Sequence, residues 1–110
     1  MITLIKDATT IGSSEAITII SGQEEAHSWH SVQIDFTGSP TTLIVRLDGS
    51  ITGDSFQALA EHVVTVKELA AGTAIFHVVN KSLPVIRATI DELEGGVSPT
   101  VSVYYLKGIS

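Results

Sequence analysis

Two aspartates in a glycine-containing stretch are the first residues whose types and spacing could bind a ligand. Asp48 and Asp54 are six positions apart in RLDGSITGDSFQAL, residues 46–59. An EF-hand calcium loop needs oxygen ligands at alternate positions and a bidentate Glu at its end, but here no Glu follows until Glu61. A phosphate-binding loop needs glycines that open a helix and a nearby Lys, but the next Lys is Lys67. Because Asp-Gly pairs are common in turns, the stretch is predicted to be a structural turn where a strand ends.

Two histidines three positions apart, His27 and His30, have a spacing that could hold a metal ion. On a helix this spacing would place two imidazole ligands on one face, close to two preceding glutamates. The segment GQEEAHSWH, however, lies between predicted strands, and no second Glu-x-x-His pair completes a ligand set. We therefore interpret it as a polar surface loop and expect no metal site. His62 and His77 lie on predicted strands, where they are expected to be exposed or hydrogen-bonded.

The sequence offers no clear catalytic group. Serine, histidine and aspartate all occur, but the G-x-S-x-G pattern that presents a nucleophilic serine is absent. The carboxylate pairs Glu24–Glu25 and Asp91–Glu92 are adjacent residues in loop-like stretches, whereas acid–base catalysis needs opposed carboxylates in fixed geometry. We therefore expect the chain not to be an enzyme, and we predict no catalytic, cofactor-binding or metal-binding residues.

The composition argues against several kinds of partner. The chain has 110 residues, a net charge of −6 and only six Lys and Arg, too few cations to bind nucleic-acid phosphates or an anionic membrane. It contains no cysteine, which excludes disulfides and thiolate metal sites. Neither a secretory signal nor an apolar run long enough to span a bilayer is found, so we expect a soluble protein made in the cytoplasm.

Alternation of apolar and polar residues is the dominant pattern that must position these side chains. In SVQIDF, Val32, Ile34 and Phe36 face one way and polar residues the other, as in a strand buried on one side. Strands are predicted at 2–5, 16–20, 31–36, 41–48, 62–67, 73–79, 84–90 and 100–106.

Seven to eight short strands separated by turn residues predict an all-β fold, an antiparallel β-sandwich in a single domain over residues 1–110. Residues 31–36 and 43–48 are expected to form a hairpin across the TGSP turn.

The segment after this hairpin is the most ambiguous part of the chain. A short helical turn or an irregular corner is predicted at 55–60, because Asp54 with Gln57 fits a capping box, and a strand is predicted at 62–67. Phe56 and Leu59 are expected to return into the core.

Three large aromatic residues remain. Alternation in the last strand places Tyr105 inward and Tyr104 outward. An exposed aromatic, Tyr104 or Trp29, could anchor a partner surface.

Four segments follow one another along most of the chain: SVQIDFTGSPTTLIVRLDGS at 31–50, FQAL at 56–59, FHVVNKSLPVIRATI at 76–90 and GGVSPTVSVYYLKG at 95–108. In this order, with the aliphatic-Arg pair Ile86-Arg87 and a closing Gly-turn-Val-x-Val hairpin, the chain resembles small β-sandwich virion structural proteins of tailed bacteriophages. It departs from that pattern at Phe56, where a Trp is frequent, and in ITGD, which lengthens the turn.

The resemblance implies a jelly-roll-like sandwich that lies in the virion and has no catalytic residues or cofactor. The expected function is that of a capsid decoration (cement) protein, which binds the major capsid protein on the outer surface of the head and stabilises it. A homo-oligomer is expected, and a trimer would suit such a protein. Residues 1–20 would be edge strands or an arm reaching a neighbour. The candidate partner contacts are Ile2, Leu4, Ile5, Trp29 and Tyr104.

Two alternatives remain open at this point. The chain could be a tail, baseplate or fibre component of the virion. It could also be a carbohydrate-binding module, which would need aromatic residues aligned on one sheet face, and only Trp29 and the two tyrosines are available for this role.

Overall fold

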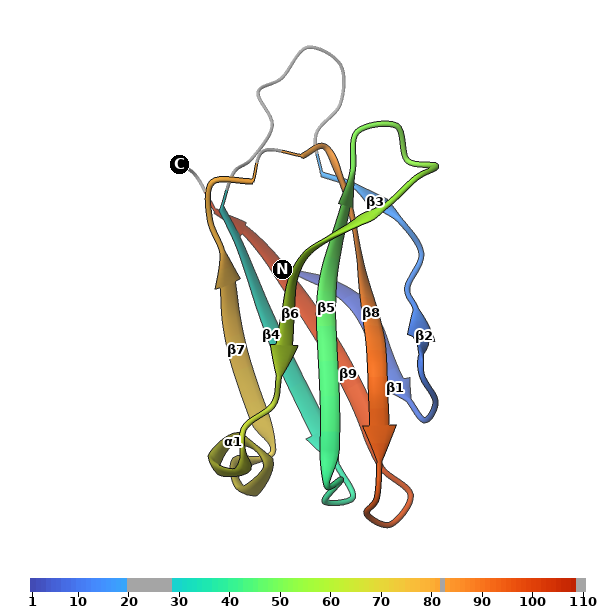
Figure 1. Cartoon of the computed structure of the whole chain (residues 1–110), viewed down its shortest axis with the longest axis vertical. Coiled ribbons are helices and arrows are strands. Elements are labelled where there is room, and N and C mark those ends of the chain that lie inside the picture. Colours follow the sequence, from blue (N-terminus) through green and yellow to red (C-terminus); the bar gives the residue numbers. More distant parts are fainter. Residues whose placement is uncertain (20–28, 82, 109–110) are drawn as a thin grey trace.

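Two antiparallel sheets packed face to face form the structure, a computed structural model that describes residues 1–19, 29–81 and 83–108 (Figure 1). The strands are β1 (Ile2–Ala8), β2 (Gly12–Ser13), β3 (Ile17–Thr18), β4 (Trp29–Thr37), β5 (Thr42–Ser50), β6 (Gln57–Val63), β7 (Thr73–Val78), β8 (Val85–Glu94) and β9 (Thr100–Gly108). A short helix, α1 (Val66–Ala71), precedes β7. No helix in the described ranges is long and apolar enough to cross a membrane.

The strand order is that of a jelly roll. One sheet has the order β1-β9-β4-β7 and the other β2-β8-β5-β6, with β3 also paired to β8. Strands β2 and β3 lie along the same neighbour, so they are two pieces of one interrupted strand. Apart from that interruption, the chain changes sheet at every connection except the β5–β6 hairpin. The predicted antiparallel, jelly-roll-like sandwich is therefore confirmed.

The core lies between the two sheets and consists of the inward residues that the alternation predicts. Val32, Ile34 and Phe36 of β4 are buried, whereas Gln33 and Asp35 between them are not. Strands β5 and β9 bring the same pattern from both sheets, with Leu43, Val45, Leu47, Val101, Val103 and Tyr105. Dense aliphatic packing of this kind makes the sandwich a stable support for its outer faces.

The predicted hairpin between 31–36 and 43–48 is wrong. Strand β4 pairs with β7 and β9, and β5 pairs with β6 and β8, so the TGSP turn carries the chain from one sheet to the other. A strand with one apolar face can pair edge to edge with the next strand or face it across a core, and the pattern is the same in both cases. Gly38 permits the crossing, because its φ is +82° and a Cβ there would lie 2.6 Å from Cα of Pro99.

The expected helical turn at 55–60 and strand at 62–67 are also wrong, since the structure places the strand first. Strand β6 satisfies the backbone groups along one edge of β5, and α1 follows it. The helix begins at a different capping box, in which the Thr65 side chain accepts from the backbone N–H of Glu68 and the Glu68 carboxylate accepts from that of Thr65. Gly72 ends the helix with a φ of 78°.

Of the two roles considered for residues 1–20, the part that the structure describes shows that of edge strands. Strand β1 pairs with β9, with two register shifts along the pair. Ile2, Leu4 and Ile5 are partly buried against the core of their own chain. These predicted partner contacts therefore stabilise the sandwich itself, and only part of each side chain is free to meet another protein.

Candidate functional site

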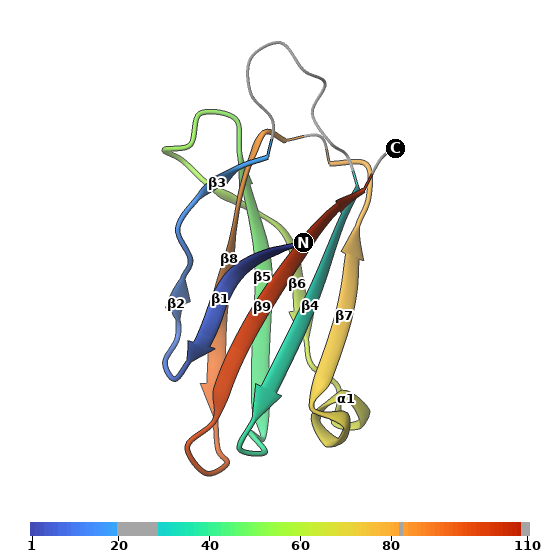
Figure 2. The same ribbon diagram turned by 180° about the vertical axis from the view of Figure 1, so that it is seen from behind.

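Figure 2 shows the β1-β9-β4-β7 sheet from its outer side. The outward residues of three neighbouring strands there are aromatic, aliphatic and hydrogen-bonding. Directly opposed residues of paired strands point to the same side, so the pairing of β4 with β9 and β7 aligns their outward residues in rows. Ser31, for example, lies between Leu106 and His77. We call this surface the β9-β4-β7 face; its residues are Trp29, Ser31, Gln33, Ile75, His77, Tyr104 and Leu106.

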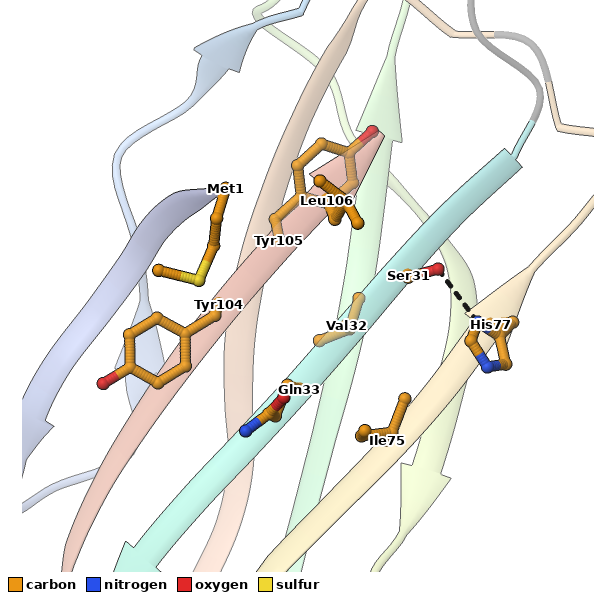
Figure 3. A pocket seen from close by; sticks show the side chains of 9 residues that line it. All are labelled: Met1, Ser31, Val32, Gln33, Ile75, His77, Tyr104, Tyr105 and Leu106. Atoms are coloured by element: carbon orange, nitrogen blue, oxygen red, sulfur yellow. Dashed lines mark hydrogen bonds between the residues drawn. The ribbon is translucent and has the colours of Figure 1, made fainter. Parts of the chain in front are cut away.

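An open groove of about 310 Å³ runs over this face (Figure 3). Met1 and Tyr104 stand on one side of the groove, Ile75 and His77 stand on the other, and Gln33 of the central strand lies between them. The groove thus combines a largely apolar lining with a few groups that can form hydrogen bonds. Binding surfaces often have this composition.

Large apolar side chains on the β9-β4-β7 face are unusually accessible to solvent. Leu106 is 55% exposed, Ile75 54% and Trp29 50%. The seven residues that define the face carry no charged side chain. The next outward residue of β4 is Asp35, whose carboxylate accepts a hydrogen bond from Nε2 of Gln33 at 3.0 Å and lies at one end of the face. Trp29 and Tyr104, two of the predicted partner contacts, therefore lie on the same face, whereas the other three predicted contacts pack against the core.

Ser31 and His77 form a polar pair in this groove. Nδ1 of His77 lies 2.9 Å from Oγ of Ser31. A nucleophilic serine also needs a group that orients the histidine and free N–H donors that stabilise an oxyanion. Ser31, however, belongs to β4, which is paired on both sides, and in the described part of the chain no carboxylate is hydrogen-bonded to His77. The geometry therefore supports a cross-strand contact that can offer hydrogen bonds to a ligand, not an activated nucleophile. His62 is likewise hydrogen-bonded, to Glu68, as expected for strand histidines.

A buried histidine lies directly beneath this face. His30 is 1% exposed; its Nδ1 lies 2.6 Å from the Tyr105 hydroxyl and its Nε2 lies 2.8 Å from the carbonyl oxygen of Lys81. The prediction of a surface loop is therefore wrong for His30, while His27 lies outside the described residues. The alternation of Val32 and Ile34, continued back by two residues, would have placed His30 inward. Burial raises the pKa of Tyr105.

The other sheet carries a closed polar cluster on its outer side, centred on Asp48. The carboxylate accepts hydrogen bonds from Nε of Arg46 at 2.8 Å, Nε of Arg87 at 3.0 Å and the Thr89 hydroxyl at 2.8 Å. Asp48 is only 1% exposed, and its hydrogen bond to Arg46 is the main cause of the raised pKa of that guanidinium. These three donors satisfy the buried carboxylate of Asp48, so the cluster stabilises the sheet.

The prediction that Asp48 ends a strand in a turn is consequently wrong. Strand β5 continues through Ser50, and the loop that follows folds back over the outer side of the sheet. Phe56 does not enter the core as expected; its ring lies 4.2 Å below the guanidinium of Arg87. Leu59, in contrast, packs against the core as expected. Within residues 1–19, 29–81 and 83–108, no group of three or more potential metal ligands comes together.

Comparisons with known proteins find a likeness of fold to one prophage-derived protein. No family model matches the chain, and no curated protein matches it. Among solved structures, the SPBc2 prophage-derived protein YomS is similar, with a TM-score of 0.52 and 12% sequence identity over 93% of this chain and 87% of that one. At this identity the likeness concerns the fold of the whole sandwich.

Proposed function

We propose that the chain is a structural protein of a tailed-phage virion and acts as a capsid decoration protein. It would bind the outer surface of the head through the β9-β4-β7 face and stabilise contacts between copies of the major capsid protein. The observation that carries the proposal is the groove lined by exposed Ile75 and Leu106 and free of charged side chains, together with exposed Trp29 elsewhere on the same face. The jelly-roll fold and its likeness to a prophage-derived protein support the proposal.

The physical basis of such binding is burial of an aromatic and aliphatic surface. A stable protein interface buries about 800 Å² on each partner, and its energy is concentrated in a few desolvated anchors such as Trp and Tyr. Trp29 and Tyr104 have this character, and Ser31 and His77 supply polar contacts at the same place. The proposal assigns no catalytic activity to the chain and requires no cofactor.

Binding to purified heads and tails of the phage that encodes the chain tests the proposal. Trp29→Ala and Tyr104→Ala are each expected to weaken binding to heads by roughly thirtyfold, or about 2 kcal/mol, without lowering the melting temperature. Ile51→Ala is the matched control, because Ile51 is 77% exposed but lies outside the face. Binding to tails and not to heads would overturn the decoration role in favour of a tail, baseplate or fibre component. Point variants are preferable to deletion of residues 1–10, which would remove strand β1.

A second candidate function, carbohydrate binding, is favoured by one specific observation. Trp29 and Tyr104 share a face with the hydrogen-bonding side chains of Ser31, Gln33 and His77. Sugars bind where an aromatic ring can cover their apolar face while nearby polar groups bond their hydroxyls. A glycan panel in a thermal-shift assay tests this function: a stabilising glycan whose effect is lost in Tyr104→Ala supports it, and no shift with any glycan excludes it.

A further inference from the structure

The two sheets of the sandwich have four edges, and the edges differ in how they are protected. The outermost strands are β1 and β7 in one sheet, and β6 and the β2–β3 pair in the other. An unprotected edge exposes a row of unpaired N–H and C=O groups that can pair with another strand. Proteins protect such edges with charged residues, bulges or very short strands.

Three of the four edges have such protection. Strand β1 carries Lys6 and Asp7 and has two register shifts. Strands β2 and β3 are only two residues long each. Strand β6 carries Glu61 and has a register shift against β5.

Strand β7 is the exception (Figure 2). Its sequence, TAIFHV, contains no Asp, Glu, Lys, Arg or Pro, and its pairing with β4 runs without a register shift. The N–H of Phe36 in β4 donates to the carbonyl oxygen of Gly72, so Gly72 and every second residue after it face β4. Thr73, Ile75 and His77 therefore direct their backbone groups outward, along the open edge of the sheet.

We propose that β7 pairs antiparallel with β7 of a second copy of the chain, so that the β1-β9-β4-β7 sheet continues across a twofold axis. With Ile75 opposite its own symmetry mate, Thr73 lies opposite His77, and all outward backbone groups of β7 find partners. On the inner side, the small Ala74 is then opposite the large Phe76. This inference concerns self-association of the free chain and does not depend on capsid binding.

The β7 edge is suited to a second copy because it is self-complementary. Its own side chains place no like charges opposite each other, which matters in a chain with a net charge of −6. Apolar side chains flank the edge: Val66 at the start of α1 is 84% exposed, Val63 at the end of β6 57%, and Val79 just after β7 50%. A twofold interface uses the same patch on both copies, so this edge yields a dimer in place of the expected trimer.

Single introduced cysteines provide a direct test, because the chain contains no cysteine. Across a hydrogen-bonded antiparallel pair the Cα atoms are about 5.5 Å apart, within the range that a disulfide spans. Ile75→Cys is therefore expected to form a covalent dimer under mild oxidation. Gln33→Cys is the matched control, since Gln33 lies opposite Ile75 but on the central strand β4. If Ile75→Cys cross-links no faster than Gln33→Cys, the pairing is refuted.

Sedimentation equilibrium of the purified chain gives the second measurement. The wild-type chain is expected to dimerise. Ile75→Pro is expected to raise the dimer dissociation constant at least about tenfold, because proline removes an N–H that points to the open edge and leaves the bonds to β4 intact. If Ile75→Pro fails to fold, Ile75→Lys replaces it as the test, because it places the ammonium groups of the two copies opposite each other. Gln33→Lys is the control for this variant. A monomeric wild-type chain, or a dimer unaffected by these variants, overturns the inference. A monomer that still binds heads would refute the dimer alone.

Discussion

Replacing Asp48 by Ala removes the centre of the polar cluster on the β2-β8-β5-β6 sheet. The carboxylate accepts hydrogen bonds from two guanidinium groups and a hydroxyl while only 1% exposed. Breaking a buried charge pair costs roughly 3–5 kcal/mol when the remaining partner stays buried. Here the side chains of Arg46 and Arg87 are 28% and 30% exposed, and Arg46 keeps its bond to Asp91. We therefore expect the free energy of unfolding to fall by about 2–3 kcal/mol.

Urea denaturation at pH 7, followed by circular dichroism at a fixed protein concentration, measures this loss. Asp91→Ala is the control, because Asp91 binds the same Arg46 but its side chain is 41% exposed. The control is expected to lose less than about 1 kcal/mol. Equal losses in the two variants would refute the reasoning, since they would show that burial of the Asp48 carboxylate adds nothing to its interactions.

Three further predictions concern individual side chains. Burial raises the pKa of Tyr105, so the stability that its neutral hydroxyl contributes is present below about pH 10 and is lost at higher pH. In Tyr105→Phe this alkaline loss should be smaller in denaturation curves. The same variant removes a hydrogen-bond partner of His30, which should cost about 1–3 kcal/mol at pH 7. The hydrogen bond from the Thr65 N–H lowers the pKa of Glu68, so the ionised Glu68 side chain contributes to the free energy of unfolding above about pH 4.3 and this contribution disappears as the pH falls further. Glu68→Gln should therefore be less stable than the wild type by about 0.5 kcal/mol at pH 7 and equally stable in acid. Gly49→Ala should lower the free energy of unfolding by about 1 kcal/mol, because a Cβ there meets the side-chain ends of two leucines. An unchanged midpoint of urea denaturation would contradict that contact.

The sequence was sufficient to predict the class of fold because period-2 alternation reports directly which residues face the core. Val32, Ile34 and Phe36 alternate in the sequence and are all buried in the structure. The pattern does not identify the neighbouring strand, so it predicts one hairpin for 31–36 and 43–48 although these segments lie in opposite sheets. Pairing depends on the whole set of strands competing for edges, and local residue types do not determine it.

The burial of individual polar residues does not follow from the sequence pattern for a related reason. Asp48 and His30 are types that normally face solvent, so their positions suggested a turn and a loop. Both are buried because partners distant in the sequence satisfy them: Arg87 and Thr89 bond Asp48, and Tyr105 bonds His30. The sequence predicts that Trp29 and Tyr104 are exposed aromatics, but their presence on one face follows only from the register of β4 with β9.

The contrast between the two outer faces of the sandwich bears on where function lies. On the β2-β8-β5-β6 sheet, the loop after β5 folds over the surface, and the Asp48 cluster pairs its own polar groups. On the opposite sheet, the described residues leave an uncharged groove, exposed large apolar side chains and the unprotected edge of β7. Exposed apolar surface and an open strand edge both carry a risk of aggregation. The proposed head-binding partner would cover the groove, and the proposed second copy would cover the edge of β7, so the two proposals together account for both features.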